Sequence, residues 1–261
     1  RYHILGQGGA VGIMHSCHSK WDKIGPTELK LLGYAVDSNN QVINTKYYQK
    51  EIIPFRPFRS NNSKVILSVG SSMDSGKTTT AAFLARGLSK MRKKVAYVKL
   101  TGTVYSKDKD FVEDCGAHYA VDFSDMGFPS TYMCSMTELL NLHSTLLQQA
   151  DAQNPHYIII EIADGLLQRE TSMLLNHAGF MNTIDHVILS CGDSMGVATG
   201  IDMLTNIGHR PFAISGLFTA SPLLVNEAQA STDIPILGLE ELRDRKILKA
   251  VLRKTDAQPQ K

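Results

Sequence analysis

Residues 65–80 read Val65-Ile66-Leu67-Ser68-Val69-Gly70-Ser71-Ser72-Met73-Asp74-Ser75-Gly76-Lys77-Thr78-Thr79-Thr80. A run of apolar and β-branched residues leads into a loop of glycine and serine, and a helical pattern over residues 81–88 follows at once. Strand, loop and helix stand in the order that a phosphate-binding loop requires. In such a loop the backbone N–H groups and the N-terminus of the helix converge on anionic oxygens. The stretch therefore predicts a P-loop whose phosphate-binding part is Gly70–Thr79.

Two side chains at the end of this loop predict more than anion binding. The ammonium of Lys77 can reach the β- and γ-phosphates of a nucleotide, and the hydroxyl of Thr78 can bind Mg²⁺. The common pattern G-x-x-x-x-G-K-[ST] would begin at Ser71, and Gly70 stands one place earlier. The alternative is a glycine–serine turn that ends in Gly-Lys-Thr by chance. The strand before the loop and the helix after it argue against that alternative.

Composition narrows the class of protein. A chain of 261 residues with 43% hydrophobic and 20% charged residues is long enough for one large domain, or one with a small addition. The net charge of +2 is too small to indicate a nucleic-acid or membrane-surface partner, and no apolar run approaches the ~20 residues of a membrane span. The cysteines are far apart, which favours a reducing, cytoplasmic location without structural zinc; they are Cys17, Cys115, Cys134 and Cys191.

The chain divides near residue 60. Residues 1–53 hold short apolar runs interrupted by glycines and by the turn Asp37-Ser38-Asn39-Asn40, and they predict a small β-rich module. Because the chain begins at Arg1 without Met, we expect this module to be the end of a larger one. Residues 54–63 contain two prolines and predict an extended linker. Residues 64–261 are expected to form the P-loop NTPase domain.

Strands and helices alternate in this second part. Several apolar runs are continuous, which is typical of strands buried on both faces of a parallel sheet. The sequence therefore predicts an α/β fold, a mostly parallel sheet covered by helices on both faces and preceded by the β-rich module. The expected strands are 65–69, 95–99, 157–162, 186–190, 211–215 and 234–237, and the expected helices are 77–91, 107–117, 136–150, 168–177, 196–207, 222–230 and 239–253.

Charged side chains follow two of these strands, at the edge where parallel sheets bind ligands. Lys99 can hold an anionic substrate or a group with developing negative charge, or it is a solvated lysine. A carboxylate after a buried strand is costly unless it is paired or binds a metal. We favour Glu161 as the acidic partner of Mg²⁺, with Asp164 as the competing candidate. The alternative is that one of the two only caps the next helix.

The segment 101–135 is long and polar and is expected to carry substrate specificity. Its carboxylates Asp108, Asp110 and Asp114 can bind Mg²⁺ or a cationic substrate, or they form the solvated start of a helix. After the fifth expected strand, Thr219 and Ser221 are the candidates for contact with a nucleotide base.

Five segments in this order resemble dethiobiotin synthetase and its relatives, among them the cobyrinic acid a,c-diamide synthases. The loop keeps that family's five residues between the first glycine and Gly-Lys-Thr, and the other segments are similar to its Tyr-Lys-Pro-x-x-x-Gly, Glu-Gly-Ala-Gly-Gly-Leu, Gly-x-x-x-Asn and Pro-x-Leu-Gly. The matching segments are Gly70–Thr78, Val98–Gly102, Glu161–Leu167, Gly216–Thr219 and Ile234–Gly238.

The resemblance implies roles for single residues. Lys77 and Thr78 would bind phosphates and Mg²⁺, Lys99 would hold the anionic group of the substrate, and Glu161 would help to place Mg²⁺. Relatives in this family are often dimers, so the resemblance also implies a homodimer.

The chain departs from the family at three places. Ser71-Ser72-Met73 replaces the family's Thr-Asp-Thr, and Asp74 can take over as an acidic metal ligand. Thr219 stands where the family often has Asn, which leaves the choice of base open. The N-terminal module is absent from dethiobiotin synthetase. We therefore do not expect the chain to be that enzyme.

Three hypotheses on function follow. The first is an ATP- and Mg²⁺-dependent ligase or kinase that transfers the γ-phosphoryl group to a small carboxylate or carbamate-like acid, with Lys77, Lys99 and Glu161 as catalytic residues. The second is a nucleotide-dependent switch or accessory ATPase whose protein partner binds the N-terminal module. The third is an acyltransferase whose loop holds a phosphorylated cofactor such as an acyl-CoA.

Overall fold

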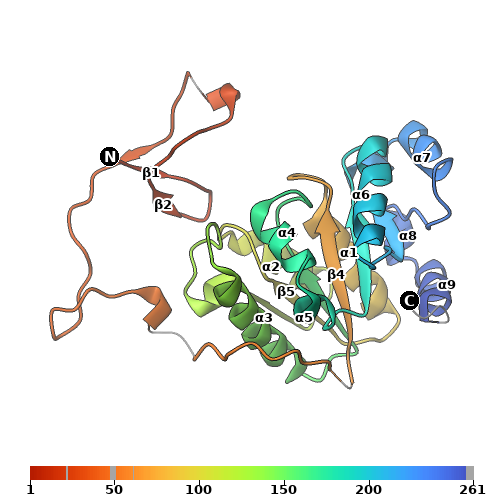
Figure 1. Cartoon of the computed structure of the whole chain (residues 1–261), viewed down its shortest axis with the longest axis horizontal. Coiled ribbons are helices and arrows are strands. Elements are labelled where there is room, and N and C mark those ends of the chain that lie inside the picture. The colour runs from red at the N-terminus through yellow and green to blue at the C-terminus, as the bar shows by residue number, and fades with distance from the viewer. Residues whose placement is uncertain (22, 48–50, 61, 257–261) are drawn as a thin grey trace.

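A six-stranded parallel sheet forms the centre of the molecule (Figure 1). The computed structural model describes residues 1–21, 23–47, 51–60 and 62–256. The strands lie in the order β6-β5-β7-β4-β8-β9, and every neighbouring pair is parallel. This confirms the predicted α/β class. The strands are β4 (Lys64–Gly70), β5 (Val95–Lys99), β6 (Tyr119–Asp122), β7 (Tyr157–Glu161), β8 (His186–Ser190) and β9 (Ala213–Ser215).

Helices cover both faces of this sheet. Successive residues of a strand point to opposite faces, so Ile66 and Tyr97 pack on one side and Leu67 and Val98 on the other. Both sides are apolar and buried, as the continuous apolar runs predict. The first face holds α1 (Lys77–Lys90), α2 (Ser106–Asp114), α8 (Leu239–Arg243) and α9 (Arg245–Asp256), and the second holds α3 (Met136–Asp151), α4 (Arg169–Leu175), α5 (Ala178–Met181), α6 (Ser194–Asn206) and α7 (Pro222–Gln229).

Three local predictions were incomplete or wrong. The segment 101–135 holds the helix expected there, which is α2, but it also contains the edge strand β6, which was not predicted. The expected strand 234–237 makes only a single bridge, between Ile236 and Ile214. The expected helix 239–253 is interrupted at Asp244, whose backbone is extended and whose carboxylate accepts hydrogen bonds from the N–H groups of Lys246 and Ile247. That carboxylate caps a new helix, so the chain turns there.

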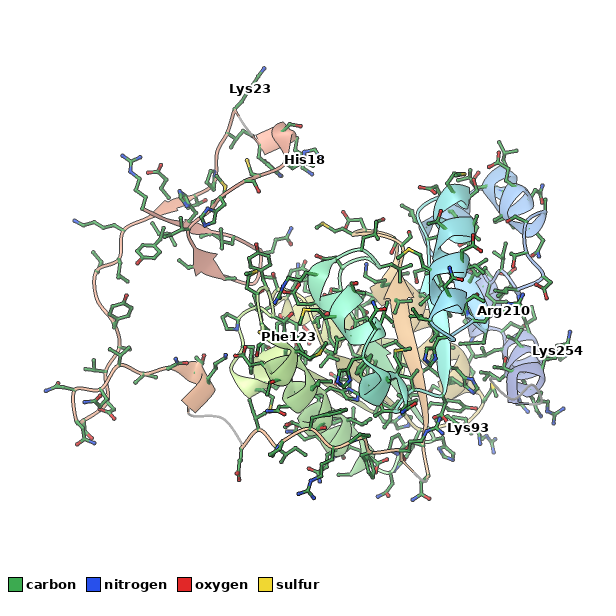
Figure 2. The ribbon with its side chains drawn as sticks, viewed as in Figure 1. His18, Lys23, Lys93, Phe123, Arg210 and Lys254 are labelled. Atoms are coloured by element: carbon green, nitrogen blue, oxygen red, sulfur yellow. The ribbon has the colours of Figure 1, made fainter. Side chains whose placement is uncertain are left out.

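The residues that the structure describes before position 48 form a small module with little core. Its β1 (Tyr2–Ile4), β2 (Val11–Gly12) and β3 (Glu28–Leu29) make an antiparallel sheet of order β2-β1-β3. No described side chain from Arg1 to Lys46 is buried. Figure 2 shows His18 and Lys23 of this module pointing into open space, whereas Phe123 lies within the body of the domain. None of the helices that the structure describes is both long and apolar enough to cross a bilayer.

Residues 51–60, called the strap below, follow this module and lie along α3. The backbone N–H groups of Ile53, Phe55 and Arg56 donate to side-chain oxygens of Thr145, Asn141 and Ser144, over 3.1, 2.8 and 3.2 Å. An extended segment leaves its N–H groups unpaired, and these three side chains of α3 satisfy them. The segment expected to be a linker is thus attached to the domain over its described length.

The strap also encloses a histidine that gives the fold a pH dependence. His143 of α3 is fully buried between the rings of Phe55 and Phe180, and its Nε2 lies 2.9 Å from Thr183 Oγ1. Burial lowers the pKa of His143 to about 3. The unfolded chain binds this proton below about pH 6.5 and the folded chain does not until about pH 3. Stability is therefore lost as the pH falls through this window.

We expect His143→Gln to flatten this loss. Below pH 6, the free energy of unfolding of the native chain should decrease with falling pH more steeply than that of the variant. The difference between the two slopes should be up to ~1.4 kcal/mol per pH unit. Urea denaturation between pH 5 and 7 measures both slopes. The control is His15→Gln, which changes an exposed histidine of the N-terminal module. Equal slopes for all three proteins would contradict this account.

Candidate functional site

The P-loop wraps closely around the side chain of Lys77, and two glycines permit this. A Cβ on Gly70 would lie 2.2 Å from Ser75 Oγ and 2.7 Å from Lys77 Cγ. Gly76 precedes α1 with a φ of +91°, a left-handed conformation that favours glycine. A Cβ there would also lie 3.2 Å from the backbone nitrogen of Leu217. Larger residues at either place would open the loop.

The ammonium of Lys77 is held inside this loop. The residue is 7% exposed, and its Nζ donates to the carbonyl oxygen of Ser72 over 2.8 Å. Burial lowers the pKa of Lys77, and the nearby carboxylates of Glu161 and Asp164 act in the opposite direction. A buried cation whose hydrogen-bond acceptors are neutral is a suitable partner for an anionic oxygen.

Glu161 is a buried acidic group in contact with the start of α1. It is 1% exposed, and its Oε1 accepts from the hydroxyl of Thr78 over 2.9 Å. Its Oε2 accepts a hydrogen bond from the hydroxyl of Tyr97 over 2.8 Å. Burial is the main cause that raises the pKa of Tyr97 well above its usual value, and the charge of this carboxylate is the second. The two residues predicted to place Mg²⁺, Thr78 and Glu161, are thus in direct contact.

This pair fits Mg²⁺ in its chemistry. Hydroxyl and carboxylate oxygens are the ligands that Mg²⁺ uses, and it commonly takes only one or two of them from the protein beside phosphate oxygens and waters. Within the described residues no group of three or more histidine, cysteine, aspartate and glutamate side chains could hold a metal by itself. Any ion at Thr78 and Glu161 therefore requires additional ligands such as phosphates.

The alignment of the strands explains how Glu161 and Lys99 meet. Ser68 of β4, Glu161 of β7, Lys99 of β5 and Asp122 of β6 stand opposite one another in register. Because directly opposite residues point to the same face, the row brings a carboxylate, an ammonium and a second carboxylate together. The Nζ of Lys99 lies 3.7 Å from Glu161 Oε1.

Lys99 is not free at this edge. It is 8% exposed, and its ammonium also makes an ion pair with Asp108 at the start of α2. Burial alone would lower the pKa of Lys99, but Glu161, Asp108 and Asp122 together raise it. Asp108, expected from the sequence as a ligand for a cation, has the lysine as its partner. An anionic substrate would reach Lys99 only in competition with these two carboxylates.

Two other predicted metal ligands, Asp74 and Asp164, lie around the loop. Asp74 is exposed, with a φ of +57°. Asp164 is partly buried and acts electrostatically on Lys77. A Cβ on the next residue, Gly165, would lie 2.6 Å from the Cα of Ser72, so the turn after β7 runs directly against the P-loop. Both carboxylates remain candidates beside Glu161.

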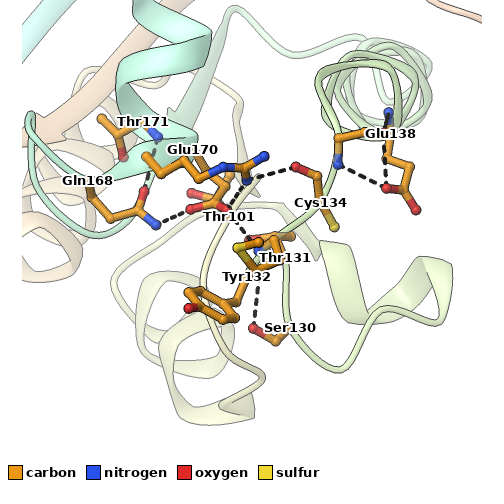
Figure 3. A network of polar contacts seen from close by, with 12 residues as sticks. Thr101, Ser130, Thr131, Tyr132, Cys134, Glu138, Gln168, Glu170 and Thr171 are labelled. Atoms are coloured by element: carbon orange, nitrogen blue, oxygen red, sulfur yellow. Dashed lines mark hydrogen bonds and ion pairs between the residues drawn. The ribbon is translucent and has the colours of Figure 1, made fainter. Parts of the chain in front are cut away.

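A second polar network joins the strand ends to α4 (Figure 3). The hydroxyl of Thr101 donates to the carbonyl of Ala163 over 2.7 Å, and the same oxygen accepts from Thr171 over 3.0 Å. The carboxylate of Glu170, 1% exposed, accepts from the backbone N–H of Met133 over 2.8 Å and pairs with Arg169. These bonds hold residues 130–134 beside the end of β7.

The sequence analysis did not identify Tyr97, Thr101 or Glu170 as parts of the site. Tyr97 stands two residues before Lys99, a spacing that places both on one face of a strand. That spacing could have indicated its contact with the site. The involvement of Glu170 had no local signal, because its partner Met133 comes from a distant loop.

The fold and the site described above can be compared with those of known proteins. No protein-family model matches the chain, and no curated protein matches it. Among solved structures, the signal recognition particle receptor FtsY from Elizabethkingia anophelis in complex with GDP gives a TM-score of 0.50 at 16% identity, over 74% of this chain and 65% of that chain. The signal recognition particle 54 kDa protein from Aeropyrum pernix K1 in complex with GDP gives 0.48 at 18% identity, over 77% of this chain and 51% of that one.

These similarities concern the fold. The chain spans less than two thirds of the length of either structure. At 16% identity the FtsY structure supports the fold alone, so the resemblance to dethiobiotin synthetase stays a prediction. With its parallel sheet, P-loop and flanking helices, the chain has a P-loop NTPase fold.

Proposed function

We propose that this chain is a Mg²⁺-dependent nucleoside triphosphatase that works as a nucleotide-dependent switch. The contact between Thr78 and Glu161, beside the buried ammonium of Lys77, carries the proposal. Bound Mg²⁺ supplies neutralisation of phosphate charge, and Thr78 and Glu161 are the residues that would hold it. Lys77 would exchange the carbonyl of Ser72 for a phosphate oxygen. The FtsY structure, which has the same fold, contains GDP, in keeping with a nucleotide at this loop.

The surroundings of Lys99 favour the switch over a ligase or kinase. A cation that already faces Glu161 and Asp108 has little attraction left for an anionic acceptor. The chain continues from Lys99 to Val104, whose carbonyl oxygen would lie 1.8 Å from a Cβ on Gly8 of the N-terminal module. A rearrangement of charge around Lys99 on nucleotide binding would therefore be transmitted to that module through only a few residues of the chain.

The N-terminal module is suited to a protein partner. Exposed apolar side chains in a small module none of whose described side chains is buried indicate an interaction surface. Those of this module are Tyr2, Ile4, Leu5, Val11, Ile13, Trp21, Ile24, Leu31, Leu32, Tyr34, Val36, Val42 and Ile43.

The second candidate function is phosphoryl transfer to a small carboxylate or carbamate-like acid. The loop fixed by Glu170 favours it, because this loop exposes Tyr132 and Met133 near the strand ends where an acceptor would bind. In that case Lys99 has to give up one carboxylate to receive the acceptor.

Release of nucleoside diphosphate, with and without small carboxylates, distinguishes the two functions. For a switch we expect no acid to raise the rate. For a ligase or kinase one acid would raise it, and Lys99→Ala would lower the ratio of stimulated to basal rate by ~10²-fold because the acceptor loses its cation. The control is Lys107→Ala, an exposed lysine of α2.

Hydrogen exchange provides an independent measurement. A non-hydrolysable nucleoside triphosphate with Mg²⁺ should change the exchange of residues 1–14 as well as that of the P-loop. Stimulation by an acid, together with unchanged exchange in the module, would replace the switch by the second candidate.

A further inference from the structure

A cavity of about 260 Å³ lies beyond the P-loop on the side of β9. It is slightly smaller than the sites of about 300–1,000 Å³ that hold whole small molecules. Its size therefore suits one flat fragment rather than a complete nucleotide. The residues that line it include Thr219, Val225, Asn226, Ile236, Gly238 and Glu241.

The cavity is connected to the P-loop through one turn of the chain. The backbone N–H of Leu217 donates to the carbonyl of Ser75 over 3.1 Å, so the turn after β9 rests on the loop. Two residues on, Thr219 donates from its hydroxyl to the carbonyl of Gly216 over 2.8 Å and lines the cavity. A nucleotide that has its phosphates beside Lys77 and extends along this turn would have its base in this cavity.

Glu241 is the charged group of the wall. It is partly buried, and its carboxylate has no hydrogen bond or ion pair with any residue that the structure describes. Its Oε2 lies 2.8 Å from where a Cβ on Gly238 would stand, so the missing side chain of Gly238 makes room for it. An ionised carboxylate only accepts hydrogen bonds, through two oxygens side by side.

We propose that Glu241 selects a guanine base. Guanine presents two adjacent donors, N1–H and N2–H, that match the two oxygens of a carboxylate. Adenine presents one donor, N6–H, next to the acceptor N1, whose lone pair would face the carboxylate. Val225 and Ile236 supply apolar contact for the ring, and Asn226 can donate to O6. This inference rests on the proposed function, because it assumes phosphates on the P-loop, and it replaces the ATP expected from the sequence by GTP.

Four ligands test the inference by calorimetry on the whole chain with Mg²⁺: GDP, ADP, xanthosine diphosphate and inorganic tripolyphosphate. GDP should bind about 10- to 100-fold more tightly than ADP, because a bidentate pair discriminates by that amount. Glu241→Gln should weaken the binding of GDP by a similar factor. It should strengthen the binding of xanthosine diphosphate, which has a carbonyl in place of the N2 amine. Gly238→Ala, which displaces the carboxylate without removing its charge, should also weaken GDP. The control is Glu240→Gln, whose carboxylate pairs with Arg243.

Tripolyphosphate distinguishes a failure of the guanine assignment from a failure of the P-loop assignment. Its affinity should be the same in all variants, because it has no base. If tripolyphosphate binds and GDP and ADP bind equally, or if Glu241→Gln weakens both alike through the ribose, the guanine assignment is wrong and the P-loop assignment stands. If tripolyphosphate and every nucleotide fail to bind, the proposed function itself is overturned.

Discussion

Replacing Lys77 by Ala is expected to weaken the binding of a nucleoside triphosphate by about 30- to 1,000-fold. The ammonium is the buried cation of the loop, and removal of a partly desolvated charge that faces phosphate oxygens costs ~2–4 kcal/mol. Calorimetry with Mg²⁺ and the nucleotide measures the change directly.

The matched control for this experiment is Lys90→Ala, at the opposite end of the same helix. It removes the same charge from α1 without approaching the loop. Equal nucleotide affinity in the native chain and in Lys77→Ala would show that residues 70–79 are a glycine–serine turn and not a phosphate-binding loop.

Replacing Glu161 by Gln is expected to lower the rate of nucleotide hydrolysis by ~10²- to 10³-fold. Glutamine keeps the shape and can still accept from Thr78, but the negative charge between Thr78, Tyr97 and Lys99 is lost. The apparent affinity for Mg²⁺ should therefore fall at least tenfold, while nucleotide binding without metal stays close to that of the native chain. Titration of Mg²⁺ at saturating nucleotide provides the measurement.

Asp164→Asn is the control that shows whether Glu161 or Asp164 is the acidic group that places Mg²⁺. Asp164 also acts on Lys77, but no hydrogen bond joins it to Thr78 among the described residues. If Asp164→Asn lowers the Mg²⁺ affinity and Glu161→Gln leaves it unchanged, the roles of the two carboxylates have to be exchanged.

Much of the fold was predictable because the strongest signals are local. The apolar run before Gly70, the glycines of the loop and the helical pattern after Lys77 all lie within one stretch of chain. The same holds for Glu161 and Lys99, since both end apolar runs. The strand β6 was missed because its four residues, Tyr119–Asp122, are too few to show a period and end in a charge that is paired with Lys109.

The parts that were not predictable depend on register. Which residue of β5 stands opposite Glu161 is decided by the alignment of two strands that are far apart in the chain. A shift by one residue would have placed Val98 there, and Lys99 would have faced the other side of the sheet. The neutralisation of Lys99 by Glu161 and Asp108 therefore becomes visible only in the folded chain, and it changes which function is favoured.

The position of β4 in the middle of the sheet affects how the protein is made. This strand carries the P-loop, yet its hydrogen-bonding neighbours are β7 and β8, which pair Lys64 with Tyr157 and Ile66 with His186. Pairing over such distances along the chain is slow because the intervening loop has to be ordered first. On the ribosome, β4 emerges long before both neighbours, and the anion-binding backbone cannot be assembled until residue 190 has been synthesised. Nucleotide therefore cannot assist folding of the first half of the domain, and a chain that ends between residues 162 and 186 would present an apolar strand edge instead of a binding site.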